Sequence, residues 1–374
     1  MLIDGVSSGS TVTCAVNDQV LVKSVSTTQF KLSRIKYDGT AQVGGSSVVR
    51  SARTSNTILA AGDNGTLIDI TSGTFSQTFT AAATLGSGWF CYIRNAGTGD
   101  ITLDPNSTET IDALATYVMY GGETRLVQCD GSGFNSVVLS SFYRAFTSTG
   151  TFTKPPGYSL FKVIAIGAGG GGEKDSFSGR AKGGGGGGAF EYLLPASFIS
   201  ATETVTIGAG GVARTTDLAP STGGNTTFGT NLIGVSGGQA HIGGSVMLRS
   251  PTAGTLDAIY SGVAVNTISG GFTPSNAGNG SDLQLSALWG GGSAQSSAQT
   301  DSGGSVYGGA AGGSLDATTI YKPGKSIFSG NGGPAVKTSS GTAGDIPGGG
   351  GGASYTGAAS GAGARGELRI WGIA

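Results

Sequence analysis

Residues 167–172 carry glycines in the spacing G-x-G-x-x-G, directly after the apolar run 163–166. Between a strand and a helix, such a loop cradles the pyrophosphate of a dinucleotide. The following sequence, EKDSFSGRAKGGGGGG, excludes a helix because each glycine costs about 1 kcal/mol there. The acid nearest the required distance, Glu191, comes after this run. No Gly-Lys-Ser/Thr follows the glycines, which also excludes a P-loop. We therefore expect no nucleotide and no other cofactor.

Histidine, cysteine and carboxylate residues are too sparse to indicate a catalytic or metal site. The single histidine, His241, excludes multi-histidine metal sites and leaves any catalytic triad dependent on one position. No motif pairs the carboxylates after residue 146 as a glycoside hydrolase requires. Cys14, Cys91 and Cys129 are odd in number and show no CxxC spacing, so we expect buried free thiols. We predict that the protein is not an enzyme.

The bulk composition is nearly neutral and poor in charge. The 374 residues carry a formal net charge of −1, and only 11% are charged, against about 25% in typical domains. This balance gives no indication of nucleic-acid binding. No signal peptide is visible, and no run of about 18 apolar residues suggests a membrane span. We expect a protein made in the cytoplasm that does not insert into a membrane.

Glycine divides the chain near residue 146. Only 16 of the 72 glycines precede that position, so about a quarter of the remaining residues are glycine, against a usual ~7%. We predict a β-structured N-terminal attachment region at 1–56, a small antiparallel β module at 57–142, and a glycine-rich domain at 143–374.

Short runs of β-branched and aromatic residues, bounded by Gly, Asn or Asp, fill the middle module. Residues 120–123 (YGGE) and 130–133 (DGSG) have the composition of hairpin turns. Two further β-like stretches, TFTKPPGYSLFKVIAIG and GARGELRIWGI, bracket the glycine-rich part. No long helical periodicity interrupts this pattern, so we predict an all-β fold.

The glycine tracts alternate with apolar residues, which argues against a flexible linker. Ordering glycine has a high entropic cost, so neighbouring contacts must offset it. Extended helices of the polyproline-II type, packed side by side, let N–H groups bond carbonyls of neighbouring helices. We predict packed polyglycine-II helices, with irregular loops on a β-sandwich as the alternative. Structural glycines at which a Cβ would separate the helices are Gly169, Gly170, Gly171, Gly172, Gly185 and Gly350.

Three stretches resemble bacteriophage proteins. FTSTGTFTKPPGYSLFKVIAIGAGGGG is similar to the opening of the glycine-rich tip domain of phage tail fibres, and GAGARGELRIWGIA to its closing strand. ATLGSGWFCYIRNAGTGDITLDPNSTETIDAL is similar to a small β module of phage fibre and host-specificity proteins. In that module Ala113 replaces the usual final glycine. The resemblance covers roughly residues 57–374.

The resemblance implies a receptor-binding protein at the tip of a phage tail, located in the virion. Its partners would be a host cell-surface receptor, either a glycan or an outer-membrane protein, and other tail, baseplate or fibre proteins at the N-terminal region. Variable loops between glycine tracts would bind the receptor. They map onto residues 173–182, 213–221, 239–250, 272–276, 296–302 and 316–329.

Candidate receptor-binding side chains are Tyr260, Trp289, Tyr307, Tyr321, Tyr355, His241 and Arg249. Exposed aromatic rings suit contacts with sugars or protein loops. Alternatively, these rings only cover the edge of the glycine stack. Because fibres are usually threefold, we expect a homotrimer, with a monomeric tip on a trimeric shaft as the rival. A purely structural tail component and a polysaccharide hydrolase are the alternative functions.

Overall fold

The computed structural model describes three strands within residues 1–47, at 2–3, 19–24 and 29–35, and most of residues 48–374. In this second part it leaves out 178–179, 230–231, 240–245, 248–284, 288, 290, 293, 295–300, 317, 358 and 374. The three early strands, β1 (Leu2–Ile3), β2 (Gln19–Ser24) and β3 (Gln29–Ile35), form one sheet in the order β1-β3-β2.

The module is built from two packed sheets. One has the order β11-β10-β7-β5-β4 and the other β6-β8-β9. Their strands are β4 (Arg50–Arg53), β5 (Leu67–Ile70), β6 (Phe75–Thr78), β7 (Phe90–Asn95), β8 (Ile101–Asp104), β9 (Tyr117–Met119), β10 (Thr124–Cys129) and β11 (Phe134–Ser140). Two short helices, η1 (Ala61–Asp63) and α1 (Ala82–Leu85), lie in the connections.

The all-β prediction is confirmed, but the module is mixed rather than purely antiparallel. Strand β5 pairs in parallel with both β4 and β7, and β6 pairs in parallel with β8. The physical reason is that the chain alternates between the two sheets, so strands of one sheet are joined by crossovers. The predicted turn at 130–133 joins the antiparallel strands β10 and β11, whereas the turn at 120–123 links strands of different sheets.

The module core lies between its two sheets. Because successive side chains of a strand point to opposite faces, Cys91 and Ile93 of β7 are buried while Phe90 and Tyr92 are half-buried. Trp89 belongs to this core, where its ring meets Phe134 edge-on at a centroid distance of 6.4 Å. Cys91 and Cys129 are buried free thiols, as predicted, and Cys14 lies outside the described residues.

The glycine-rich domain begins as a second pair of sheets. One has the order β12-β22-β14-β15 and the other β13-β16-β17-β18-β19. Their strands are β12 (Tyr143–Phe146), β13 (Gly150–Thr153), β14 (Leu160–Ile166), β15 (Ala189–Pro195), β16 (Thr202–Thr206), β17 (Thr226–Phe228), β18 (Ile233–Val235), β19 (Val246–Met247) and β22 (Glu367–Ile373). The short helix η2 (Ala196–Phe198) follows β15, and β20 (Leu285–Ala287) pairs with β21 (Gly304–Ser305).

The two β-like stretches that bracket the glycine tracts in sequence are direct neighbours in space. Strand β22, near the end of the chain, lies between β12 and β14 and pairs antiparallel with both. Leu368 and Ile370 of β22 are fully buried against Val163 of β14. The chain therefore leaves this sheet after β14 and β15, forms the glycine-rich segments, and returns to the same sheet at β22.

The module and the glycine-rich domain share a hydrophobic core. Tyr120 of the module stacks on Phe152 of β13 with ring centroids 5.6 Å apart. Arg125 of β10 is buried and donates a hydrogen bond to the carbonyl of Pro156, in the connection that leads to β14. These contacts fix the base of the glycine-rich domain against the module.

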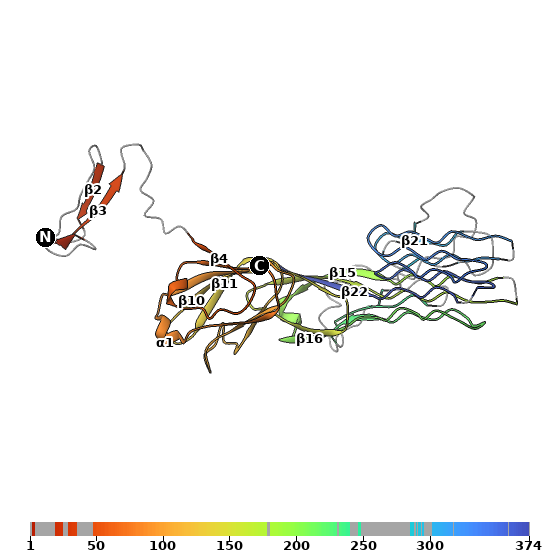
Figure 1. The fold of residues 1–374 in the computed structure, drawn as a ribbon, viewed down its shortest axis with the longest axis horizontal. Coiled ribbons are helices and arrows are strands. Elements are labelled where there is room, and N and C mark those ends of the chain that lie inside the picture. The colour runs from red at the N-terminus through yellow and green to blue at the C-terminus, as the bar shows by residue number, and fades with distance from the viewer. Residues whose placement is uncertain are drawn as a thin grey trace.

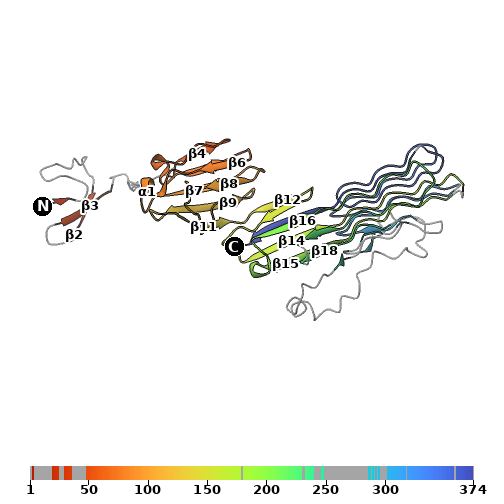
Figure 2. The ribbon, with the colours of Figure 1, turned by 90° about the horizontal axis from the view of Figure 1, so that it is seen from below.

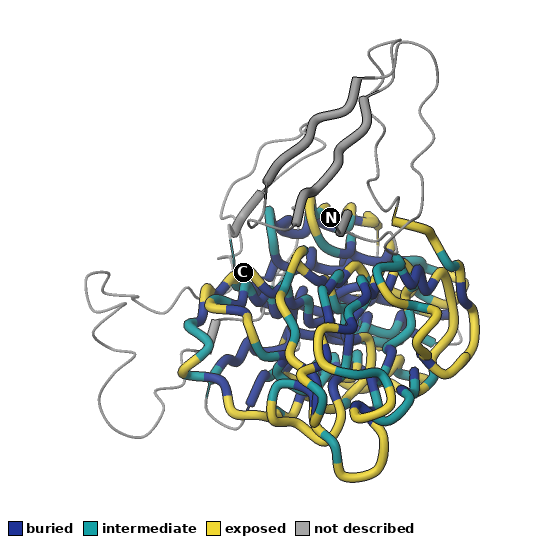
Figure 3. Tube along the Cα trace, turned by 90° about the vertical axis from the view of Figure 1, so that its left-hand side faces the viewer, coloured by how far each residue is buried: buried dark blue, intermediate teal, exposed yellow. Residues whose placement is uncertain are grey.

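Beyond the sheets, the glycine-rich segments run side by side away from the module (Figures 1 and 2). Seen down the long axis, buried residues fill the centre and exposed residues form the rim (Figure 3). In the part of the chain that the structure describes, no helix has the length and apolar character needed to span a bilayer.

Candidate binding surface

The glycine-rich segments are held together by backbone hydrogen bonds with a period of three residues. In the central segment 348–353, Gly350 donates to Ala310 at 2.8 Å, and Ala353, three positions later, donates to Gly313 at 3.0 Å. Each segment position therefore faces the same neighbour as the position three residues along the chain. This pattern differs from a β-ladder, where the period is two.

The central segment has hydrogen-bonded neighbours on every side. These neighbours are the segments 167–173, 181–188, 308–315, 330–336, 341–345 and 359–366. Since one backbone bonds several others, its N–H and C=O groups are satisfied without a sheet. The segments together form a rigid bundle that carries the turns between them.

Side chains have little room inside the bundle. A Cβ added to Gly350 would overlap the carbonyl oxygen of Gly184 and lie 2.9 Å from the amide nitrogen of Gly312. A Cβ at Gly170 would lie 3.0 Å from two backbone oxygens. The other glycines predicted to be structural, Gly169, Gly171, Gly172 and Gly185, are buried. The segments approach too closely here for any residue but glycine.

Chain reversals gather at the two ends of the bundle. The far end, away from the module, carries the turns 174–180, 213–220, 316–320, 337–340 and 355–359, of which the structure describes all residues but 178–179, 317 and 358. The near end, beside the sheets, carries 306–308, 326–329 and 346–347. The far end is thus a surface of several turns from distant parts of the sequence, which we call the far-end surface.

The far-end turns are fastened to one another. Lys174 Nζ donates to the carbonyl of Thr215 at 3.0 Å. The Ser176 amide and hydroxyl both donate to Asp217 Oδ1 at 2.8 Å, and the same hydroxyl lies 3.2 Å from the carbonyl of Tyr355. Three turns are therefore bound into one support.

Apolar side chains project from this support. Phe177 is 86% exposed, and its amide donates to Asp175 Oδ1 at 2.9 Å, which fixes its backbone. Val212, Leu218 and Ile320 are also exposed at the same end. An exposed aromatic ring on an ordered backbone binds a partner at a low entropic cost.

The turn at 316–320 is built around one carboxylate. Asp316 Oδ1 accepts hydrogen bonds from the amides of Thr318 and Thr319, and Oδ2 accepts one from the Tyr321 hydroxyl at 2.7 Å. These bonds, with that of Tyr321 the strongest, hold the pKa of Asp316 far below its usual range. Tyr321 is buried beneath the turn, so its main contact is structural.

The structure does not bring the predicted binding residues together. Tyr355 is half-buried at the far-end surface, beside the small apolar cluster Ala181, Leu315, Ala335 and Ala353. Trp289 and Tyr307 belong to the near end. His241, Arg249 and Tyr260 lie outside the described residues, as do most of the predicted loops 239–250, 272–276 and 296–302.

The near-end rings form a stack. The ring centroid of Trp289 lies 5.3 Å from that of Phe190 and 4.1 Å from that of Tyr307. The centroids of Tyr307 and Phe328 are 5.1 Å apart. The last two pairs are parallel within about 15°. Tyr307 therefore lies between two nearly parallel rings, and Tyr307 covers one face of Trp289.

The predicted binding loops 173–182 and 213–221 both lie at the far end. The predicted loop 316–329 is instead two separate turns, because 316–320 lies at the far end whereas 326–329 lies at the near end. The sequence does not predict Phe177 or the turns 337–340 and 355–359 as parts of this surface. A signal for Phe177 exists, since it is the only aromatic residue in the polar run EKDSFSGR.

Within the described residues, no group of three or more His, Cys, Asp or Glu side chains is placed to hold a metal ion. The half-buried Glu173 accepts a hydrogen bond from the Lys182 amide at 2.9 Å, and burial raises its pKa. It closes the 174–180 turn at its base.

Comparison with known proteins agrees with this architecture. The model of a glycine-rich domain family matches residues 146–371, from the end of β12 to β22. A search of curated proteins finds no match. The family match spans more than half of the chain and covers the bundle and its sheets, so the chain belongs to the glycine-rich domain family.

Proposed function

We propose that the protein is a bacteriophage tail-fibre tip protein that binds a receptor on the host cell surface. The observation that carries this proposal is the exposed Phe177 ring on turns fastened by hydrogen bonds. The resemblance to phage tail-fibre tips and membership of the glycine-rich domain family support it. Binding is passive, with no bond made or broken and no cofactor.

The proposal includes packed polyglycine-II helices as the scaffold. The three-residue period of the hydrogen bonds around 348–353 supports it, because a polyproline-II-type helix has three residues per turn. The segment 348–353 also has hydrogen-bonded neighbours on all sides, as expected for bundled helices. A strand in a β-sheet would have such neighbours on two sides only. Such a bundle holds the far-end turns in place.

In the proposed virion, the N-terminal region attaches the chain to other tail or fibre proteins. The module separates this attachment from the far-end surface. The chain is made in the host cytoplasm and assembled into the tail, without inserting into a membrane.

We further propose that the chain assembles as a homotrimer through the outer face of the module sheet. Val137, Leu126, Tyr92 and Leu67 are register neighbours across four strands on this face. Val137 is 59% exposed, and the other three are half-buried. Because solvated faces of sheets are usually polar, an apolar row favours an apolar partner, and every copy carries the same row.

Cell binding tests the proposed function. The purified full chain, labelled with a fluorophore, is applied to the bacterial strain that the corresponding phage infects. We expect Phe177→Ser to weaken binding about tenfold or more, since central aromatic anchors contribute most of the energy of an interface. Ile346→Ser is the matched control, because Ile346 is 62% exposed but lies at the near end.

Equal binding by the two variants would contradict the proposed surface. Failure of the unmodified chain to bind cells or block infection would favour a purely structural tail protein. Strains with defective lipopolysaccharide separate a glycan receptor from an outer-membrane protein. Shortened polysaccharide after incubation with the chain would reveal hydrolysis in place of passive binding.

A further inference from the structure

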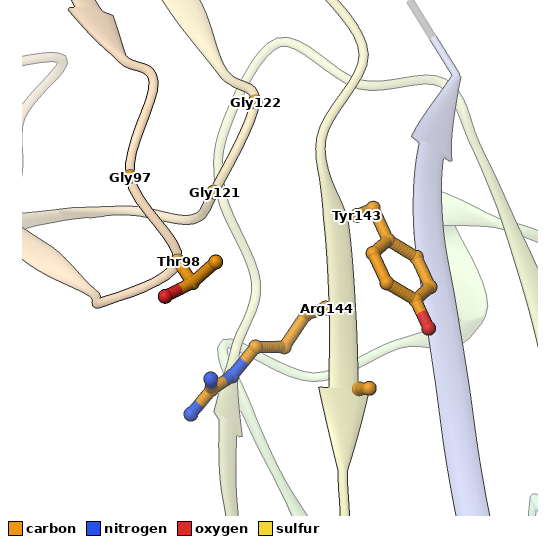
Figure 4. Close-up of a pocket in the computed structure, with 7 residues that line it drawn as sticks. Gly97, Thr98, Gly121, Gly122, Tyr143 and Arg144 are labelled. Atoms are coloured by element: carbon orange, nitrogen blue, oxygen red, sulfur yellow. The ribbon is translucent and has the colours of Figure 1, made fainter. Parts of the chain in front are cut away.

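A cavity of about 460 Å³ lies where the module meets the glycine-rich domain (Figure 4). Glycine-containing turns at 97–98 and 121–122 form one wall, and residues 143–145 of β12 form the other. These walls are mainly apolar, and Arg144 Nη2 already lies 3.0 Å from Asp100 Oδ2. The outer face of the module sheet, by contrast, presents two positive charges side by side.

Arg50 of β4 and Arg94 of β7 meet at Asp69 of β5, the strand that lies between them. Arg94 Nε donates to Asp69 Oδ1 at 2.7 Å, and Arg94 Nη2 donates to Oδ2 at 2.9 Å. Arg50 Nε donates to the same Oδ2 at 2.6 Å. Since the neighbours of Asp69 on β5, Ile68 and Ile70, point into the module core, the three charged groups lie together on the outer face.

The carboxylate of Asp69 fixes the two guanidinium groups in place. Its side chain is fully covered, whereas the side chains of Arg50 and Arg94 are 55% and 45% exposed. The hydrogen bond from Arg94 is the largest cause that lowers the pKa of Asp69, so this carboxylate is ionised at neutral pH. Two guanidinium groups and one carboxylate leave a surplus of one positive charge at a fixed place on the sheet.

Both guanidinium groups keep N–H donors for a further partner. Each has five N–H donors, and Asp69 is contacted through Nε and Nη2 in both residues. Within the part of the chain that the structure describes, neither Nη1 group has a partner. Thr124 is the register neighbour of Arg94 on β10, close enough in a sheet for its hydroxyl to add an uncharged donor.

We propose that this arginine pair binds a phosphate group. Phosphate oxygens accept the parallel N–H groups of a guanidinium, and two neighbouring guanidinium groups can each hold a different oxygen of one tetrahedral group. The repulsion between the two arginines, which Asp69 offsets only in part, falls further when an anion joins them.

A second arginine pair lacks this arrangement. Arg365 and Arg369 both contact Glu367, but at opposite oxygens: Arg365 Nη1 lies 3.3 Å from Oε2, and Arg369 Nε lies 2.7 Å from Oε1. Arg365 Nη1 also donates to the carbonyl of Gly366. These side chains are only 30% and 29% exposed, so the pair offers fewer donors and serves as the matched control.

The phosphate site goes beyond the proposed function and does not depend on it. It shares no residue with the far-end surface, and none with the apolar row from Leu67 to Val137. It gives the module a ligand of its own, held by a sheet that is distant from the receptor-binding turns in the chain.

Phosphorus NMR of the full chain tests the proposal through the broadening of the ligand signal. Inorganic phosphate, glucose 6-phosphate and dimethyl phosphate separate free phosphate, a monoester and a diester. We expect saturable broadening with at least one of them, and about tenfold weaker binding by Arg50→Gln, which removes one charged donor. Arg365→Gln should bind like the unmodified chain. Thermal unfolding checks that both variants remain folded.

Absence of saturable broadening with all three ligands would overturn the proposal. So would equal binding by Arg50→Gln and the unmodified chain, or complete displacement by sodium chloride at equal ionic strength, which would indicate an adventitious ion only. If Arg50→Gln unfolds, Arg50→Lys gives a second measurement, because lysine keeps the charge but lacks the paired donors; unchanged affinity there would also count against the site. Phe177→Ser should keep phosphate binding while losing cell binding, so the two proposals fail separately.

Discussion

Asp130 illustrates how single side chains set turns in this protein. Its Oδ1 accepts hydrogen bonds from the Ser132 amide, the Ser132 hydroxyl and the Gly133 amide, each at 2.8 Å. The bonds to Ser132 are the largest cause lowering the Asp130 pKa to about 2. The ionised carboxylate closes the β10–β11 turn.

The pH dependence of this turn follows from the direction of the shift. Because the folded pKa lies below the ordinary value of 3.8, the ionised form stabilises the fold above that value. We expect this contribution to be lost as pH falls from about 4 to about 2. NMR titration of the Asp130 carboxyl carbon measures the midpoint, and a midpoint near 4 would contradict the turn geometry. Asp130→Asn should flatten the pH response of the neighbouring amides.

At the residue scale the candidate site was only partly predictable. The loops 173–182 and 213–221 follow from the resemblance to phage tail-fibre tips, in which variable loops lie between glycine tracts. The position of Phe177 depends on the bond of its neighbour Ser176 to Asp217 in another turn, and the burial of Tyr321 depends on how its own turn folds around Asp316. Local composition does not determine such contacts, since the residues meet only after the bundle forms.

At the level of elements, the glycine segments depend on close backbone approach. Gly350→Ala should strongly destabilise the glycine-rich domain, because its Cβ would overlap the Gly184 carbonyl oxygen. Gly62→Ala is the control, since a Cβ there meets nothing within 4 Å. We expect a loss of several kcal/mol for the first, as overpacking costs ~1–3 kcal/mol even where side chains can adjust. Urea unfolding measures both, and equal stability of the two variants would argue against the packed bundle.

The strands themselves were visible in the sequence, but their pairing was only partly so. The β-like stretches TFTKPPGYSLFKVIAIG and GARGELRIWGI predict strands, and the structure pairs β14 of the first directly with β22 of the second. The parallel pairings of β5 with β4 and β7 were not predicted. Strand direction within a sheet depends on how the chain crosses between sheets. A short apolar run does not determine these crossings, so it does not predict the direction of its strand.

For the molecule as a whole, the apolar row on the module predicts self-association. We expect the purified chain to have three times the mass of one chain in light scattering after gel filtration. Val137→Thr with Leu139→Thr should shift the population towards single chains, because threonine keeps the strand but removes apolar contact. Val212→Thr at the far end is the control. A monomeric unmodified chain would contradict the proposed trimer.

The central position of β22 has a consequence for synthesis. About 200 residues separate β14 from its partner β22, and a ribosome adds roughly 5–20 residues per second. During synthesis, β22 therefore becomes available to pair with β12 and β14 only on the order of tens of seconds after β14 has been made. A chain interrupted before Glu367 has β12 and β14 with no strand between them. The ribosome must therefore pass Glu367 before this sheet can form, so the domain closes only after every glycine segment between β14 and β22 has been made.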